Sequence, residues 1–180
     1  MKMKRGSIMN HTLDIINSRS SIRKFTASLI PEEVCRTLIE AGLRAPTATN
    51  RQEIHISVTT GDNPIQQEIQ NDLKPDADVN FYFNAPLVFY LSGDDSFKWS
   101  DVDAGIAVEN IHLAAAAMGL GSVILGCVKD VLTGEKKAYY DKKLDIQEGY
   151  SFRVAIAIGY PDTEKPQHSF DFEKNVTIVG

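Results

Sequence analysis

The segment from Ser100 to Gly119 does most to constrain the fold of this 180-residue chain. Ser100 and Asp103 form a start resembling a capping box, and Gly119 is a typical stop, so one long helix is predicted between them. Its second half, residues 114–118, is alanine-rich and nearly apolar on every side. Because a helix that is apolar all round has to be buried, we expect this one to lie either in the core or between subunits.

Shorter helices and strands are predicted on both sides of this helix. Apolar spacing and end signals predict helices that begin at Thr12, Pro31 and Pro64, and a short helix near 134–140. Alternating or continuous apolar runs predict strands over 54–60, 87–91, 122–128 and 152–158. Taken alone, this alternation of helices and strands favours a doubly wound parallel sheet.

The length of the chain predicts one compact domain, which we assign to residues 11–180. Residues 1–10 lack the apolar core of a signal peptide, and we expect a flexible leader there. After residues 159–161 the domain continues as a polar, extended tail. The tail ends in apolar residues that would make a poor free end, so we expect them to dock on another surface: Val176, Ile178 and Val179.

Charge and cysteine content exclude several classes of function. A formal net charge of −5 argues against a sequence-independent binder of nucleic acid or of acidic membranes, which needs a basic surface. No apolar run approaches membrane-spanning length. Cys35 and Cys127 provide neither a disulfide framework nor metal-ligand spacing, which fits a reducing cytoplasm. The four histidines also lack metal-type spacing, so we predict no metal site.

Residues 18–25, Ser-Arg-Ser-Ser-Ile-Arg-Lys-Phe, combine cations and hydroxyls at spacings suited to a phosphate. If the first helix continues through them, Arg19 and Arg23 lie four apart on one face. If the backbone is extended, Arg19, Ser21 and Arg23 point the same way. Either geometry directs two guanidinium groups at one spot, where a phosphate would accept charge-assisted hydrogen bonds. The alternative is a solvated basic helix end that the helix dipole favours.

The loop at 45–52, Ala-Pro-Thr-Ala-Thr-Asn-Arg-Gln, is a second candidate site because it links a helix to a strand. In an extended chain the amides of Asn50 and Gln52 face the same side. An amide carries both a donor and an acceptor, which suits the edge of a pyrimidine-like ring. The alternative is plain turn chemistry, because threonine, asparagine and proline are common loop residues.

Glycines after the long helix do not form a dinucleotide fingerprint, because that fingerprint needs a strand, a glycine turn and then a helix. Gly119 and Gly121 instead follow a helix and precede a strand. Gly126, just past that strand, is the better ligand contact, since its flat backbone could lie against a planar ring. No serine lies in a nucleophile elbow, and Glu109 is more simply a paired or interface carboxylate. An anion site and a ring-edge site without an obvious protein catalyst indicate an organic cofactor.

Three segments, in this order, resemble the nitroreductase family of FMN-dependent oxidoreductases. Residues 18–25 resemble its N-terminal Arg-x-Ser-x-Arg phosphate motif, and residues 45–52 are similar to its Ala-Pro-Ser-x-x-Asn-x-Gln loop. Residues 103–122 resemble its central helix and the strand that follows. The resemblance covers nearly all of residues 12–161. One departure follows Gln52, where this chain has Glu-Ile and the family often has proline and an aromatic residue.

The resemblance implies an α+β fold rather than a doubly wound one: a mixed, largely antiparallel sheet flanked by helices, in an intertwined homodimer that binds two FMN molecules between its subunits. By resemblance, the phosphate and ribityl chain would be held by Arg19, Ser20, Ser21 and Arg23, with further cations from the tail at Lys165 and His168. The ring would lie near Pro46 and Thr47, and its ribityl–pyrimidine side would bond Asn50 and Gln52. The partner subunit would contribute Leu125 and Gly126.

The function that the resemblance implies is transfer of reducing equivalents from NADH or NADPH to FMN and then to nitroaromatics, quinones or similar acceptors, in ping-pong order. The chemistry would be carried by FMN, with no catalytic side chain. Alternatives are a specialised flavin enzyme of the same fold, such as a dehalogenase or dehydrogenase, and a non-catalytic flavin-binding protein. The short segment between the strands at 54–60 and 87–91 leaves little room for a substrate lid, which favours an open pocket.

Overall fold

A four-stranded sheet forms the centre of the computed structural model, which describes residues 11–61, 63–75 and 79–180. The predicted leader at 1–10 lies outside the described residues. The strand order is β1-β2-β4-β3, and each neighbouring pair is antiparallel. The strands run over His55–Thr60 (β1), Leu87–Asp94 (β2), Gly121–Leu125 (β3) and Tyr150–Gly159 (β4).

The α+β fold with a largely antiparallel sheet is confirmed, and the parallel sheet that helix–strand alternation favoured is wrong. The cause is burial on both faces: β2 is buried from Leu87 to Gly93, so it has the continuous apolar sequence that is typical of parallel strands. A parallel contact occurs at an isolated bridge between Ser21 and Ser122.

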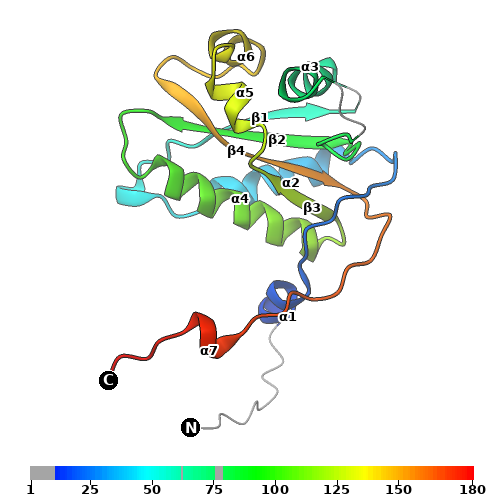
Figure 1. The fold of residues 1–180 in the computed structure, drawn as a ribbon, viewed down its shortest axis with the longest axis vertical. Helices are drawn as coiled ribbons and strands as arrows, with labels where there is room; N and C mark the ends of the chain where they lie inside the picture. Colours follow the sequence, from blue (N-terminus) through cyan, green and yellow to red (C-terminus); the bar gives the residue numbers. More distant parts are fainter. Residues whose placement is uncertain (1–10, 62, 76–78) are drawn as a thin grey trace.

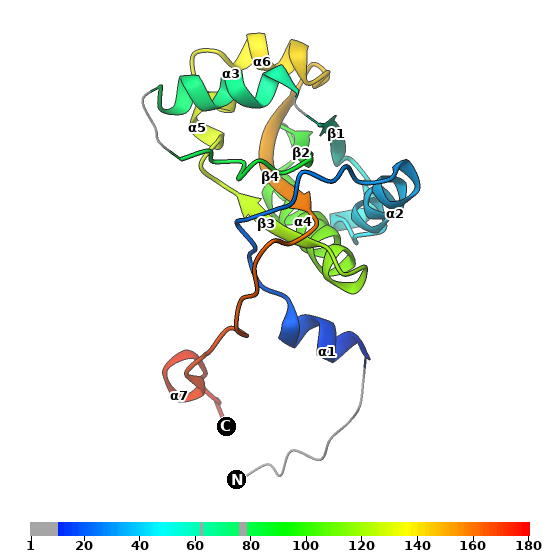
Figure 2. The ribbon, with the colours of Figure 1, turned by 90° about the vertical axis from the view of Figure 1, so that its right-hand side faces the viewer.

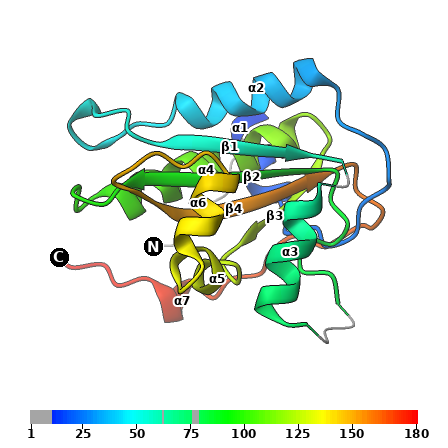
Figure 3. The ribbon, with the colours of Figure 1, turned by 90° about the horizontal axis from the view of Figure 1, so that it is seen from above.

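Helices cover both faces of the sheet (Figures 1, 2 and 3). One layer contains α2 (Glu32–Leu43) and α4 (Ser100–Ala117), and the other contains α3 (Pro64–Leu73), α5 (Lys129–Thr133) and α6 (Lys137–Lys143). Along β2 the side chains alternate between two apolar clusters. Leu87 and Phe89 pack with α2 and α4, whereas Val88 and Tyr90 pack with the other layer.

The long helix α4 is buried on one side only. Ala107 and Ile111 are at most 1% exposed, whereas Val102 and Ile106 are 52% and 37% exposed. A close approach of α2 helps to bury the inner face, since a Cβ at Gly42 would lie 2.8 Å from Ile111 Cδ1. The predicted core position is therefore confirmed for the inner face, and the outer face remains apolar and exposed. Gly119 has a φ of +73° just beyond the helix, as its predicted stop requires.

Two predicted boundaries are wrong. The strand expected over 122–128 ends at Leu125, and a turn then leads into α5. The single helix expected near 134–140 is replaced by two short helices that Gly134 separates. Apolar composition alone could not distinguish a strand from the turn and helix start that follow it. Cys127 accordingly lies exposed in the turn rather than in a buried strand.

The first and last segments of the described chain run side by side before they leave the body of the domain (Figures 1 and 2). The Thr26 N–H donates to the Tyr160 carbonyl at 2.9 Å, and the Asp162 N–H donates to the Lys24 carbonyl at 3.0 Å. Beyond these contacts lie α1 (His11–Ser18) and α7 (Phe172–Asn175). Within the described residues, no helix has both the length and the apolar character needed to cross a bilayer.

Candidate functional site

The basic segment at 18–25 is extended, which selects one of the two predicted geometries. Helix α1 ends at Ser18, and Ser21 then pairs with Ser122 at the start of β3. The Ile22 N–H donates to the Ser122 carbonyl at 3.0 Å. A Cβ at Gly121 would lie 2.9 Å from Ile22 Cβ, so the glycine permits this close approach. The segment is thereby fixed beside β3.

A cavity of about 350 Å³ opens beside this extended segment. Arg19, Ser20 and Lys165 line it, and the Lys165 ammonium donates to the Ser21 carbonyl at 3.3 Å. One carboxylate, from Glu164, also lines the cavity. The fold thus brings together two cations that lie far apart in the sequence. The remaining two predicted cations, Arg23 and His168, are exposed and lie outside this cavity. Ser21 does not line it either, so the extended segment does not bring Arg19, Ser21 and Arg23 to one cavity as expected.

Arg19 contacts a residue that the sequence analysis did not assign to the site. Its Nη1 lies 2.8 Å from His112 Nε2, and its Nε lies 3.9 Å from a Glu109 oxygen. His112 is 2% exposed, and its Nδ1 lies 2.5 Å from Ser122 Oγ. Because a guanidinium only donates, Nε2 must accept and Nδ1 must carry the ring proton. The sequence does carry a signal for this contact, since Glu109, His112 and Ala116 share one face of α4, but that spacing is not the spacing of metal ligands.

His112 gives the stability of the protein a specific pH dependence. Burial, with a smaller contribution from the Arg19 charge, lowers its pKa to about 4, against about 6.5 in an unfolded chain. Between about pH 4 and about pH 6.5 the unfolded chain therefore binds more protons at this histidine than the folded protein does. The contribution of His112 to the free energy of unfolding is complete above about pH 6.5 and is lost as the pH falls toward 4, with a slope of at most about 1.4 kcal/mol per pH unit.

We expect His112→Gln to flatten the dependence of the unfolding free energy on pH in that window. Urea denaturation between about pH 4.5 and pH 7.5 measures it for both proteins. Parallel curves for the two proteins would contradict the assignment of a neutral, buried imidazole.

The second candidate segment, at 45–52, forms a compact turn rather than an extended chain. A short 3₁₀ helix occupies Ala48–Asn50. Thr49, Asn50 and Gln52 have φ angles of 57°, 55° and 54°, and the Gln52 N–H donates to Thr47 Oγ1 at 2.9 Å. The extended spacing expected to align the Asn50 and Gln52 amides is therefore wrong, because the threonine hydroxyl closes the turn. Left-handed backbone at non-glycine residues costs free energy and clusters at functional sites.

Helix α4 anchors this turn through Asp103. The Ala48 N–H donates to both carboxylate oxygens, at 3.1 and 3.0 Å, and Asp103 is 2% exposed. Thr47 and Gln52 line a cavity of about 250 Å³ together with Ala107 of α4. The other two predicted residues of this loop, Pro46 and Asn50, are exposed and lie outside that cavity. Asp103 and His112 lie about 13 Å apart along the axis of α4, which therefore orders both candidate segments.

The two residues predicted at the end of β3 differ in what they can offer a ligand. Leu125 is 3% exposed and its side chain packs in the core cluster of the α3–α5–α6 layer, so only its backbone is left for a contact. Gly126 is exposed, and a Cβ there would meet no heavy atom within 4 Å. Core packing therefore does not require a glycine at this position.

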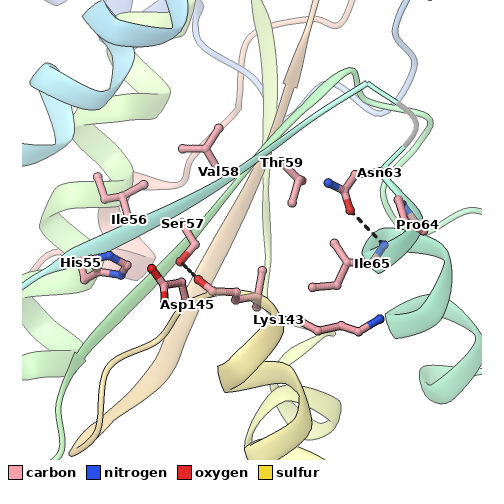
Figure 4. A pocket seen from close by; sticks show the side chains of 11 residues that line it. His55, Ile56, Ser57, Val58, Thr59, Asn63, Pro64, Ile65, Lys143 and Asp145 are labelled. Carbon is pink, nitrogen blue, oxygen red and sulfur yellow. Dashed lines mark hydrogen bonds between the residues drawn. The ribbon is translucent and has the colours of Figure 1, made fainter.

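A larger cavity, of about 460 Å³, lies along β1 on the other face of the sheet (Figure 4). Most of its polar groups already bond protein atoms. Ser57 donates to the Leu144 carbonyl, Asn63 accepts from the Ile65 N–H at 3.0 Å, and Lys143 pairs with Glu68 at 2.6 Å. We therefore centre the candidate site on α4 and β3. In the described part of the chain, no three His, Cys, Asp or Glu side chains are grouped to hold a metal ion.

Comparisons with known proteins bear on the family and the fold of the chain. The model of the nitroreductase family matches residues 16–80 and 60–160. An NADPH-flavin oxidoreductase of Vibrio harveyi is 29% identical over 171 residues, which cover 86% of this chain and 67% of that protein. An FMN-dependent nitroreductase of Clostridium difficile R20291 is 30% identical with a TM-score of 0.83, covering 94% and 99% of the two chains. A nitroreductase with bound FMN from Desulfitobacterium hafniense DCB-2 is 25% identical with a TM-score of 0.85, covering 96% and 100%.

Proposed function

The chain belongs to the nitroreductase family, and from that premise we propose that it is an FMN-dependent oxidoreductase that passes reducing equivalents from NADH or NADPH to a nitroaromatic, quinone or similar acceptor. The named relatives support both parts of the proposal: one is an NADPH-flavin oxidoreductase, and solved relatives include an FMN-dependent nitroreductase and a nitroreductase with bound FMN.

The observation that carries the proposal is the cavity beside β3. Arg19, Lys165 and Ser20 line it, and a guanidinium, an ammonium and a hydroxyl are a donor set that suits the phosphate of FMN. We assign Ser21 and Arg23 to the same end of the cofactor, with His168 as a further cation from the tail. The single carboxylate in the wall, that of Glu164, leaves a positive balance for a dianionic ligand.

The ring end of the cofactor is assigned to the turn that Asp103 anchors. Thr47 and Gln52 line the small cavity against α4, and Pro46 and Asn50 lie exposed beside it. Leu125 and Gly126, which has open space where a Cβ would lie, are assigned to the same ring. When bound, FMN supplies the two-electron chemistry by accepting a hydride and later giving it up. The protein's part is to bind, to orient and to supply positive potential.

Steady-state kinetics with NADPH, then NADH, against a quinone and a nitroaromatic acceptor test this proposal. Because the two substrates would use one open pocket in turn, we expect parallel double-reciprocal lines. No flavin-dependent turnover with any of the four pairs would overturn the proposed activity, and intersecting lines would overturn the ping-pong order alone.

The proposal includes a homodimer, because one copy of the chain exposes apolar surface that needs a partner. On α4, Val102 and Ile106 are exposed, and on α1, Leu13 and Ile16 are 46% and 48% exposed. At the end of the tail, Ile178 and Val179 are 83% and 90% exposed. Apolar surface of this kind is typical of an interface, and a second copy of the chain is the partner we propose. Its tail would then dock through the residues predicted to need a surface, which are Val176, Ile178 and Val179.

We expect Ile106→Asp to convert the dimer into monomers at micromolar concentration, because it would bury an unpaired carboxylate in an apolar interface at a cost of several kcal/mol. Analytical ultracentrifugation measures the change. Tyr139→Ser is the control, since it removes a 50% exposed aromatic side chain from α6 in the other helical layer. A variant that remains dimeric would remove α4 from the proposed interface.

The proposed location is a reducing compartment, the cytoplasm. Both cysteines of the chain, Cys35 and Cys127, are free thiols. Partial desolvation of the sulfur raises the pKa of each, also at Cys127, which lies in an exposed turn. Such thiols are poorly ionised near neutral pH, and they therefore react slowly.

A further inference from the structure

A buried imidazole joins the three segments that form the phosphate end of the candidate site. His112 comes from α4, Arg19 from the extended N-terminal segment and Ser122 from β3. All three line the same cavity of about 350 Å³. Ser122 also holds the N-terminal segment through its carbonyl, which accepts from the Ile22 N–H. Ser122 therefore binds the imidazole through its side chain and the segment that carries Arg19 through its backbone.

We propose that His112 is a positioning residue, which holds the Arg19 guanidinium in the orientation that presents its remaining N–H groups to the phosphate. This inference rests on the proposed function. The Arg19 side chain is 24% exposed, so it is confined without being sealed from the cavity. A guanidinium carries five N–H donors in a fixed fork. One of them is directed at His112 Nε2, which determines where the others point.

A neutral acceptor suits this task better than a carboxylate. An imidazole binds the guanidinium without cancelling its charge, so the whole positive charge stays available to an anion. Burial lowers the pKa of His112 to about 4, which keeps the ring neutral near pH 7. Glu109 is the nearby carboxylate, but it lies 3.9 Å from Nε and its side chain is 47% exposed. An ion pair that long and that open to solvent orients a partner weakly.

Two amide substitutions separate the two hydrogen bonds of the ring. The amide of Asn reaches about as far as Nδ1, so His112→Asn keeps a group for Ser122 and loses the acceptor for Arg19. The amide of Gln reaches about as far as Nε2, so His112→Gln keeps the acceptor for Arg19. Both variants place a polar amide in the same buried position, which makes them matched controls for folding.

The measurement compares FMN with riboflavin, which lacks only the phosphate. The full-length protein is loaded with either flavin, and the dissociation constant follows from the recovery of flavin fluorescence on dilution. We expect His112→Asn to weaken FMN binding about tenfold and riboflavin binding less than about twofold, and His112→Gln to keep the FMN preference within about threefold of the wild type. In an Arg19→Ala background, His112→Asn should change FMN binding by less than about twofold.

Each other outcome overturns the inference. Equal losses for FMN and riboflavin would show that His112 only supports the fold. Equal FMN preference in the Asn and Gln variants, or a full effect of His112→Asn without Arg19, would show that the imidazole does not act through the guanidinium. If the wild-type chain holds neither flavin, the proposed function fails as well, which distinguishes that failure from the failure of this inference alone.

Discussion

Arg19→Ala is expected to weaken FMN binding about 100-fold, because it removes a guanidinium that can make two charge-assisted hydrogen bonds to a phosphate, each worth about 1.5 kcal/mol. Arg19 is the only arginine of the basic segment that lines the cavity among the described residues. Riboflavin binding should change by less than about threefold, since that ligand has no phosphate. Fluorescence titration with both flavins measures the two dissociation constants.

A matched control for that substitution lies five residues further along the same segment. Lys24→Ala also removes one positive charge, but the Lys24 ammonium pairs with Asp162 at 2.8 Å and lies outside the cavity. We expect it to change FMN affinity by less than about twofold, as is usual for an exposed ion pair. Equal losses in Arg19→Ala and Lys24→Ala would mean that FMN responds to general charge and not to this site.

Asp103→Ala is expected to lower the free energy of unfolding by about 2–3 kcal/mol and to weaken the binding of both flavins. The buried carboxylate accepts from the Ala48 N–H with both oxygens, and a hydrogen bond to a charged group contributes about 1.5–3 kcal/mol. Without it, the turn with its left-handed residues Thr49, Asn50 and Gln52 would lose these hydrogen bonds to α4. Urea denaturation of the flavin-loaded protein gives the stability change.

Ala48→Pro tests the same bond from its other end. Proline has no N–H, and it is tolerated at the first position of a helix, which Ala48 occupies after an extended Thr47. This variant would leave the Asp103 carboxylate buried without its donor, so we expect a loss of about 2 kcal/mol. The double variant should lose clearly less than the sum of the two single losses. Additive losses would show that the carboxylate and the N–H act independently.

The fold could be predicted from the sequence where local signals are strong, and not where direction depends on long-range pairing. The start signal at Ser100 and the glycine stop at Gly119 placed α4 within about two residues. The predicted capping box itself is wrong, because the N-cap is Trp99 without a side-chain hydrogen bond and Ser100 Oγ is buried without a partner. The direction of β2 against β1 and β4 has no local signal, because a continuous apolar run such as Leu87 to Leu91 is compatible with a parallel or an antiparallel neighbour. The structure pairs it antiparallel on both sides. The antiparallel sheet was therefore predicted only through the family resemblance.

The site could be predicted in part for a similar reason. The basic segment and the Pro46–Gln52 loop are visible as motifs, and the structure places Arg19 with Lys165 through contacts between the two ends of the chain. The role of His112 was not predicted, because it depends on the contact of α4 with the N-terminal segment. The left-handed turn at Asn50 was not predicted either. The Thr47 hydroxyl closes this turn, but threonine is a common loop residue, and its presence in the sequence does not indicate that role.

The absorption spectrum of the purified full-length protein, recorded anaerobically before and after addition of NADPH or NADH, tests the central claim most directly. The account predicts a yellow protein whose bound, phosphate-bearing flavin bleaches on addition of either nucleotide and regains its colour when a quinone is added. A colourless protein that takes up no added FMN, or a bound flavin that neither nucleotide bleaches, would contradict it.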